Sequence, residues 1–428
     1  MNKSDIYYKT YLEILKEELI PAMGCTEPIA LAYAAAKARE VLGALPERVF
    51  LQVSGSIIKN VKSVIVPNTN QLKGMPAAAA AGIIAGDPDK KLEVISQVKE
   101  EEVSEMRNFL ETVQIDIEHI DYGHVFDIIV TEYCADSYVK VRICDFHTNI
   151  VLIEKDGNVI LKKETENVKC DEKGTADRGL LSMERIWDFA NTVEIKDVKE
   201  LLDRQIQYNS AIAEEGLLGD YGANIGSVLL QTYGNDIKVR AKAKAAAGSD
   251  ARMNGCELPV IINSGSGNQG ITCSVPLIEY AKELNSGKEA LYRALVLSNL
   301  IAIHEKTGIG TLSAYCGAVS AGAGAGAGIA YLCGGGYQDV IHTVVNALAI
   351  VSGIVCDGAK ASCAAKIASS VDAAILGYHM YKNHQEFKGG DGIVMNDIEA
   401  TIKGIGKLGK DGMRETNNEI IKMMVGME

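Results

Sequence analysis

Two long uncharged segments constrain the fold of this chain most strongly. Residues 312–336 (LSAYCGAVSAGAGAGAGIAYLCGGG) and 340–356 (VIHTVVNALAIVSGIVC) contain no Asp, Glu, Lys or Arg. Such segments must either enter a lipid bilayer or be buried in a helical core. The first is mostly Ala and Gly, which insert weakly, and the second carries His342 and Asn346. We therefore expect two buried central helices that pack closely through small side chains.

The residue pattern differs between the middle of the chain and the segments on either side of it. Residues 91–168 hold most of the charge and most of the β-branched alternation, with a hairpin expected around Asp156-Gly157. The flanking residues have mostly helical patterns, broken by glycine-rich turns. At 428 residues the chain exceeds one typical core. We expect an α+β protein with a mostly helical catalytic domain (1–87 and 169–428) containing Gly/Ala-rich buried helices, plus a small inserted α/β domain (88–168).

Composition excludes several classes of protein. A net charge of −13 argues against nucleic acids and acidic membranes as partners. The first 19 residues form a charged amphipathic pattern, unlike a secretory signal, so we expect a cytoplasmic protein with reduced thiols among its ten cysteines. No CxxC pair occurs, so a zinc ribbon has no support. The sequence does not reveal the oligomeric state, although an apolar helical surface makes a homodimer a reasonable expectation.

Cys316, Cys356 and Cys363 form a possible ligand set. Seven residues of helix turn about 700° and rise about 10 Å, which is too far for two ligands of one metal ion. The intervening Cys-Asp-Gly favours a turn, and Cys316 precedes the Gly/Ala-rich helix. Three thiolates without a fourth partner would suit a [4Fe–4S] cluster with one open iron. From spacing alone, three small core residues are the simpler interpretation.

Cys25 is a separate case. It lies in a Gly-Cys-Thr-Glu-Pro turn directly before a predicted helix. A cysteine at a helix N-terminus can have a lowered pKa and act as a base or nucleophile. The alternative is an incidental cysteine in a capping turn.

Five ordered motifs resemble one known family. They are GCTEPIALAYAAA, SGSIIKN, NSGSGNQGITCSVP, CGAVSAGAGAGAG and VCDGAKASCAAKI, spread over residues 20–400. Together they resemble the L-cysteine desulfidase family, which is related to the catalytic chain of iron–sulfur L-serine dehydratases. The resemblance implies conversion of L-cysteine to pyruvate, ammonia and hydrogen sulfide with a [4Fe–4S] cluster and no pyridoxal phosphate. It also implies Cys316, Cys356 and Cys363 as cluster ligands and Cys25 as the base.

The implied α,β-elimination defines the groups that the site must supply. An open iron can act as a Lewis acid toward the leaving sulfur, while a thiolate at Cys25 removes the Cα proton. The substrate carboxylate and ammonium need polar partners, although each polar loop residue could equally satisfy its own backbone. His304 could carry protons or be structural. The candidate substrate contacts are Ser54, Ser56, Lys59, Asn60, Ser264, Ser266, Asn268, Gln269, Lys306 and Lys360.

Four alternatives compete with this interpretation. L-Serine differs from L-cysteine by one atom and is the closer rival as substrate. A pyridoxal-phosphate lyase is suggested by GSGNQG and CGGG, but the long Gly/Ala helices do not fit a doubly wound α/β fold. A membrane transporter would partition with membranes, and an iron–sulfur redox sensor would show no lyase activity at substrate saturation. The sequence does not reveal the role of the inserted domain or the physiological purpose.

Overall fold

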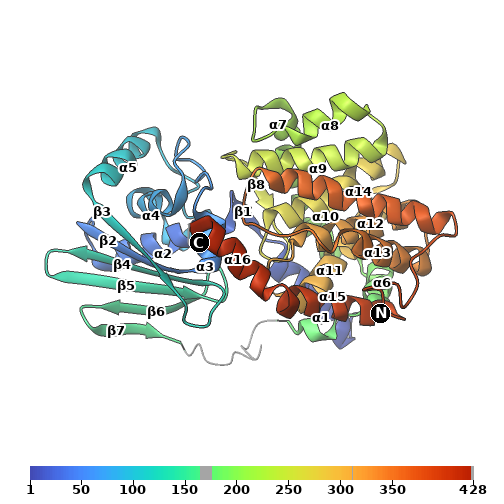
Figure 1. The fold of residues 1–428 in the computed structure, drawn as a ribbon, viewed down its shortest axis with the longest axis horizontal. Coiled ribbons are helices and arrows are strands. Elements are labelled where there is room, and N and C mark those ends of the chain that lie inside the picture. The colour runs from blue at the N-terminus through green and yellow to red at the C-terminus, as the bar shows by residue number, and fades with distance from the viewer. Residues whose placement is uncertain (164–175, 311, 426–428) are drawn as a thin grey trace.

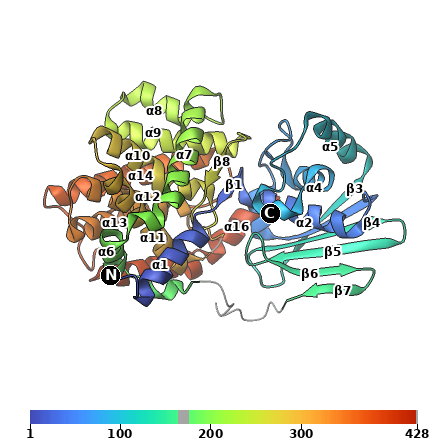
Figure 2. The ribbon, with the colours of Figure 1, turned by 180° about the vertical axis from the view of Figure 1, so that it is seen from behind.

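A computed structural model describes residues 1–163, 176–310 and 312–425 of the chain, which form two lobes side by side (Figures 1 and 2). The α/β lobe contains α2 (Thr26–Leu42), β2 (Arg48–Ser54), α3 (Gly55–Val61), α4 (Gly74–Ala85), α5 (Glu100–Thr112), β3 (Gln114–Ile120), β4 (Asp127–Cys134), β5 (Ser137–Cys144), β6 (Ile150–Lys155) and β7 (Asn158–Lys162). The helical lobe contains α1 (Ile6–Glu18), α6 (Met183–Thr192), α7 (Ile195–Leu218), α8 (Ile225–Tyr233), α9 (Ile237–Met253), α10 (Gly267–Glu283), α11 (Lys288–Ile309), α12 (Gly317–Leu332), α13 (Tyr337–Val351), α14 (Ser362–Lys382) and α15 (Ile398–Lys407). The protein is thus α+β and mostly helical, as the sequence predicts.

The α/β lobe is built on one six-stranded sheet with strand order β3-β2-β4-β5-β6-β7. Strands β2 and β3 are parallel, and the other neighbours are antiparallel. Helix α2 packs on β4 and β5, and α4 packs on α2. The hairpin expected at Asp156-Gly157 joins β6 to β7. Every element of the lobe therefore contributes to one layered core.

The boundary expected at residue 88 does not coincide with the edge of this lobe. Strand β2 lies between β3 and β4 in the sheet, and α2 and α4 also belong to the lobe. Local pattern shows that residues 48–54 form a strand but not which strands pair with it. The boundary expected at 168/169 lies outside the described residues.

Helix α12 occupies the centre of the helical lobe, where it packs against α10, α11, α13 and α14 (Figure 1). Its glycines permit this crowding on two sides. A Cβ atom at Gly322 would lie 2.8 Å from Cβ of Ser370 in α14, and one at Gly324 would lie 2.5 Å from the carbonyl oxygen of Ser298 in α11. The first uncharged segment is therefore a buried central helix, as expected, whereas α13, formed from the second, keeps one face partly exposed, as at Ile350. No helix of the described residues is long and apolar enough to cross a membrane.

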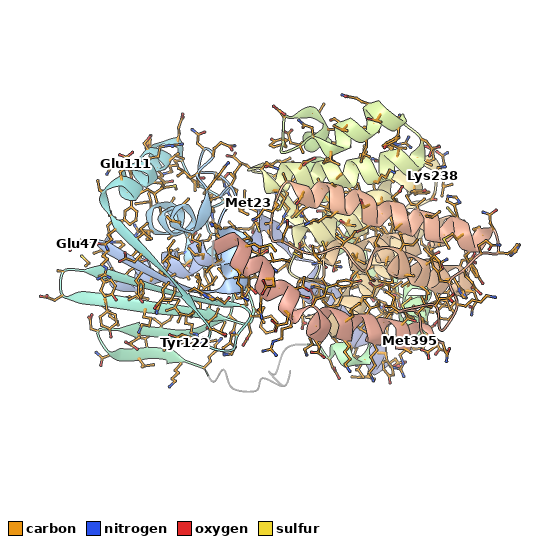
Figure 3. All side chains as sticks on the ribbon, viewed as in Figure 1. Met23, Glu47, Glu111, Tyr122, Lys238 and Met395 are labelled. Carbon is orange, nitrogen blue, oxygen red and sulfur yellow. The ribbon has the colours of Figure 1, made fainter. Side chains whose placement is uncertain are left out.

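The lobes are joined by short pairings at their boundary. Strand β1 (Pro21–Met23) pairs antiparallel with β8 (Pro259–Ile261), and Met23 lies where the lobes meet (Figure 3). Helix α16 (Arg414–Val425) runs from the helical lobe to pack on α3 (Figure 1). Residues 48–68 are rich in β-branched side chains, yet a helix begins at Gly55, where contacts with α16 and α4 bury the segment.

Candidate active site

Cys316 and Cys356 are brought together by a single β-bridge. Cys316 immediately precedes α12, and Cys356 lies in the segment between α13 and α14. Tyr315 bridges Val355, and the Cys356 amide donates to the Ala314 carbonyl at 2.6 Å. The thiol of Cys316 forms a hydrogen bond that lowers the pKa of Cys356, which the nearby lysine charges also lower. Residues forty positions apart thus place two sulfurs side by side.

Gly358 brings the third cysteine to the same place. Helix α13 ends at Val351 and α14 begins at Ser362, so the Cys-Asp-Gly stretch is a turn, as the sequence indicated. Gly358 has φ of 93°, and its carbonyl accepts a hydrogen bond from the Cys363 thiol at 3.5 Å. A Cβ atom here would lie 2.2 Å from the Lys59 carbonyl oxygen. Only glycine fits this turn, which carries Cys356 at one end and Cys363 at the other.

Two lysines supply positive charge beside the three sulfurs. Lys59 is completely buried, and its Nζ donates to Oδ1 of Asn417 at 2.7 Å and to the Cys356 carbonyl at 3.3 Å. Burial lowers the pKa of both Lys59 and Lys306, while the charges of Cys356 and Cys316 oppose that shift. Cationic neighbours favour thiolates, and an all-sulfur donor set is the one that iron–sulfur clusters use. The residues present therefore fit a cluster with three protein ligands.

A cavity of about 120 Å³ opens onto these cysteines. Ten of the residues predicted from sequence line it, contributed by both lobes: Cys25, Asn60, Ser264, Ser266, Asn268, Gln269, Lys306, Cys316, Cys356 and Cys363.

Other predicted residues lie outside the cavity lining. Oγ of Ser54 donates to the Val125 carbonyl at 2.7 Å, and Ser56 is buried in α3. Nζ of Lys360 donates to the Lys59 carbonyl at 3.4 Å, and His304 pairs with Glu399 at 2.8 Å. These side chains are not among the residues that line the cavity, although Lys360 lies close enough to Cys363, Cys25 and Cys356 for their charges to affect its pKa.

Cys25 lies directly before α2, but its pKa differs from the expectation. Its thiol donates to Oε2 of Glu27 at 3.0 Å. Burial and the charge of Glu27 raise the pKa of Cys25 well above its ordinary value, although Arg252 acts in the opposite direction. Desolvation of the thiolate outweighs the helix N-terminus. Cys25 is therefore a thiol in this structure, not a preformed thiolate.

Glu27 and His147 are cavity residues that the sequence analysis missed. Burial opposes ionisation of Glu27, but His147, the Cys25 thiol and the backbone lower its pKa to about 2. His147 lies in the loop between β5 and β6, with Nε2 at 3.9 Å from Oε1 of Glu27. Glu27 lies two positions after Cys25, in the first turn of a helix. Carboxylates are common there, so its sequence position gave no sign of a role in the site. His147 had no local signal, because only the sheet brings it here.

Arg252 is a third missed cavity residue. It lies near the end of α9 and is 3% exposed. Nη1 donates to Oδ1 of Asn268 at 3.1 Å, whereas Nε is buried without a partner in the part of the chain that the structure describes. The signal in the sequence was a lone arginine that directly follows residues 245–251, most of which have small side chains. Oε1 of Gln269 is also buried without a partner.

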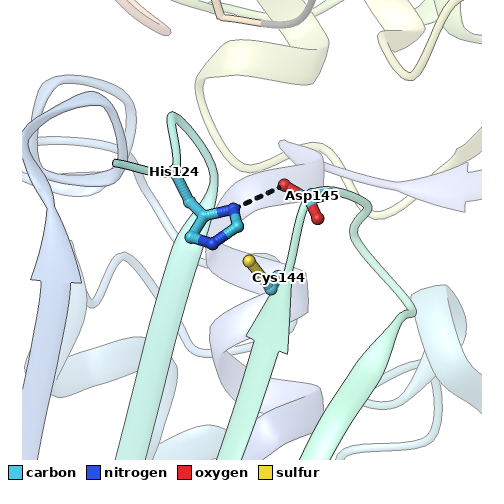
Figure 4. Close-up of side chains that lie close together, drawn as sticks. All are labelled: His124, Cys144 and Asp145. Atoms are coloured by element: carbon cyan, nitrogen blue, oxygen red, sulfur yellow. Dashed lines mark hydrogen bonds and ion pairs between the residues drawn. The ribbon is translucent and has the colours of Figure 1, made fainter. Parts of the chain in front are cut away.

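A polar cluster on the α/β lobe supports the loop that carries His147. Nδ1 of His124 and Oδ1 of Asp145 lie 3.0 Å apart, and Sγ of Cys144 lies beside them (Figure 4). Phe126 packs edge-on against His147 with ring centroids 4.7 Å apart. These contacts fix the β5–β6 loop against the β3–β4 loop, and so hold His147 near Glu27.

Comparison with known proteins agrees with this geometry. The chain matches the family described as serine dehydratase alpha chain over residues 89–422. A UPF0597 protein of Desulfitobacterium hafniense is 64% identical over 425 residues, which cover 99% of this chain and 98% of that protein. A UPF0597 protein of Lachnoclostridium phytofermentans is 54% identical over 98% of this chain and 100% of its own length. The resemblance seen in the five motifs is thereby confirmed, and the chain belongs to the serine dehydratase alpha chain family of lyases.

Proposed function

We propose that this protein is a [4Fe–4S] lyase that eliminates hydrogen sulfide from L-cysteine to give pyruvate and ammonia. The observation that carries the proposal is that Cys316, Cys356 and Cys363 line one cavity together with Cys25. Family membership supports the reaction class, since dehydration of serine is the oxygen analogue of this elimination.

The three cysteines would hold the cluster. When bound, the cluster supplies a Lewis-acidic iron that polarises the bond to the leaving sulfur. Lys59 and Lys306 offset the negative charge that three thiolates bring into this buried region. The Gly358 turn keeps Cys356 and Cys363 at a fixed separation.

Cys25 would remove the Cα proton. The thiol must first lose its own proton to solvent, because Glu27, which accepts the thiol hydrogen bond at 3.0 Å, has a pKa of about 2 and is too weak a base to keep it. The Cα–H electron pair then forms the carbon–carbon double bond, and the carbon–sulfur bond breaks to release HS⁻. The resulting aminoacrylate tautomerises and is hydrolysed by water to pyruvate and ammonia.

L-Serine is the second candidate substrate. The family description favours it, because its members are named for serine dehydration. A thiol is the better ligand for iron and HS⁻ is the better leaving group than hydroxide, so a shared site favours L-cysteine on chemical grounds.

Single-cysteine variants test the proposed division of roles. Replacing Cys316, Cys356 or Cys363 with serine should lower the iron content of anaerobically purified protein. Replacing Cys25 with serine should leave the iron content and the visible absorption of the cluster intact and abolish release of sulfide. Cys256, buried outside the cavity lining, provides the matched control. Loss of iron from the Cys25 variant would show that Cys25 is a ligand and not the base.

A further inference from the structure

Arg252 carries a charge that nothing in the described residues neutralises. The side chain is 3% exposed and lines the cavity, yet it forms no ion pair with a carboxylate of the described residues. Among the described residues, its single hydrogen bond goes to the neutral amide oxygen of Asn268, and Nε finds no partner. A buried unpaired cation is costly, so a fold that keeps one at a cavity wall is suited to an anionic ligand.

The cavity wall around Arg252 also presents groups that favour an anionic ligand. Helix α10 begins at Gly267, so the free N–H groups of its first turn lie at the cavity, where Ser266, Asn268 and Gln269 line the wall. A Cβ atom at Gly267 would lie 2.3 Å from Nε of Arg252. Glycine at this position therefore leaves the space that the guanidinium occupies.

We propose that Arg252 and the N-terminal turn of α10 form the subsite that binds the α-carboxylate of an amino-acid substrate. This assignment rests on the proposed function and deepens it, because it identifies the group that orients the substrate. Carboxylates are planar two-oxygen anions, and a guanidinium matches them with parallel N–H donors. The subsite selects free amino acids over amides, esters and simple thiols.

Binding of unreactive ligands tests the subsite without turnover. L-2-Aminobutyrate has a methyl group in place of the thiol, so it cannot undergo the elimination, and L-2-aminobutyramide differs from it only in lacking the carboxylate charge. Calorimetric titration of the cluster-loaded wild-type protein should show the acid binding about 10- to 100-fold more tightly than the amide, as expected for a charge-assisted pair. Arg252→Gln should reduce this preference to within about threefold.

A second variant keeps the charge of Arg252 but displaces its guanidinium group. Gly267→Ala should displace the guanidinium and reduce the preference for the acid in the same way, while leaving all side-chain charges unchanged. Gly287→Ala is the matched control, because Gly287 also lies at the start of a helix, as the N-cap of α11, and a Cβ atom there meets nothing within 4 Å. That control should bind both ligands as the wild type does.

The outcomes separate this inference from the proposed function. If Arg252→Gln weakens both ligands equally, or leaves their ratio unchanged while iron is lost, Arg252 serves the fold or the cluster and the subsite is refuted. If the preference for the acid depends on Arg252 but L-cysteine yields no sulfide, the subsite stands and the proposed reaction fails.

Discussion

Gly358→Ala should damage the cluster site through the backbone alone. Gly358 has φ of 93°, a conformation that costs an L-residue about 1–2 kcal/mol. The added Cβ atom would lie 2.2 Å from the Lys59 carbonyl oxygen, which belongs to backbone and cannot rotate away. Overpacking of this kind costs about 1–3 kcal/mol. We expect the free energy of unfolding to fall by about 2–5 kcal/mol, a large share of the 5–15 kcal/mol typical of a protein.

The nearby Gly353 provides the control for this experiment. It lies in the same connection between α13 and α14, is exposed, has φ outside the left-handed region, and a Cβ atom there meets nothing within 4 Å. Gly353→Ala should therefore change stability by less than about 1 kcal/mol, in the stabilising direction if at all. Urea unfolding of the iron-free proteins measures both values without interference from the cluster.

Iron content then links the strain to the site. The backbone of Gly358 contacts both Cys356 and Cys363, so a shifted turn separates the two sulfurs. Gly358→Ala should bind less iron on anaerobic reconstitution than wild type, and Gly353→Ala should bind the same amount. Equal stability and equal iron in the two variants would refute the claim that this turn positions the ligands.

Two further predictions concern buried acids. Burial raises the pKa of Asp250 to about 6, above its ordinary 3.8, so the stability that this group contributes is present below pH 3.8 and is lost as the pH rises through 6. Relative to Asp250→Asn, the wild type should therefore lose about 1.5 kcal/mol of unfolding free energy between pH 5 and pH 8, measured by urea unfolding; an unchanged difference between the two proteins would contradict the assigned pKa. Glu27→Gln removes a charge that raises the pKa of Cys25, so Cys25 should be alkylated faster by iodoacetamide at pH 8, as followed by mass spectrometry of its peptide. Unchanged alkylation would mean that Glu27 does not control the thiol.

Many of the helices and strands could be predicted from the sequence, because local residue patterns determine them. Absence of charge and abundance of glycine in 317–332 predict a buried, closely packed helix, and the structure shows neighbours on both sides of it. Alternation predicts strands β3 to β7. The place of β2 inside the sheet could not be predicted, because residues 48–54 pair with residues 66–85 positions later in the chain, and local patterns do not encode such long-range pairing.

Site residues that belong to sequence motifs were predicted. Site residues that only the tertiary structure brings to the cavity were missed. The three cysteines and the 264–269 loop follow from motifs that also carry the family resemblance. Glu27 was hidden by its ordinary position in a first helical turn, and His147 and Arg252 reach the cavity from separate elements. The expected low pKa of Cys25 failed because burial beside a carboxylate cannot be read from a helix start.

The most direct test of the central claim is an anaerobic assay of the reconstituted protein with L-cysteine, in which iron, sulfide and pyruvate are measured on the same sample. The account predicts that sulfide and pyruvate are released in equal amounts, and that exposure to oxygen abolishes both. Full iron loading with no sulfide from L-cysteine would contradict the account. Pyruvate formed only from L-serine would keep the reaction class and assign the other substrate.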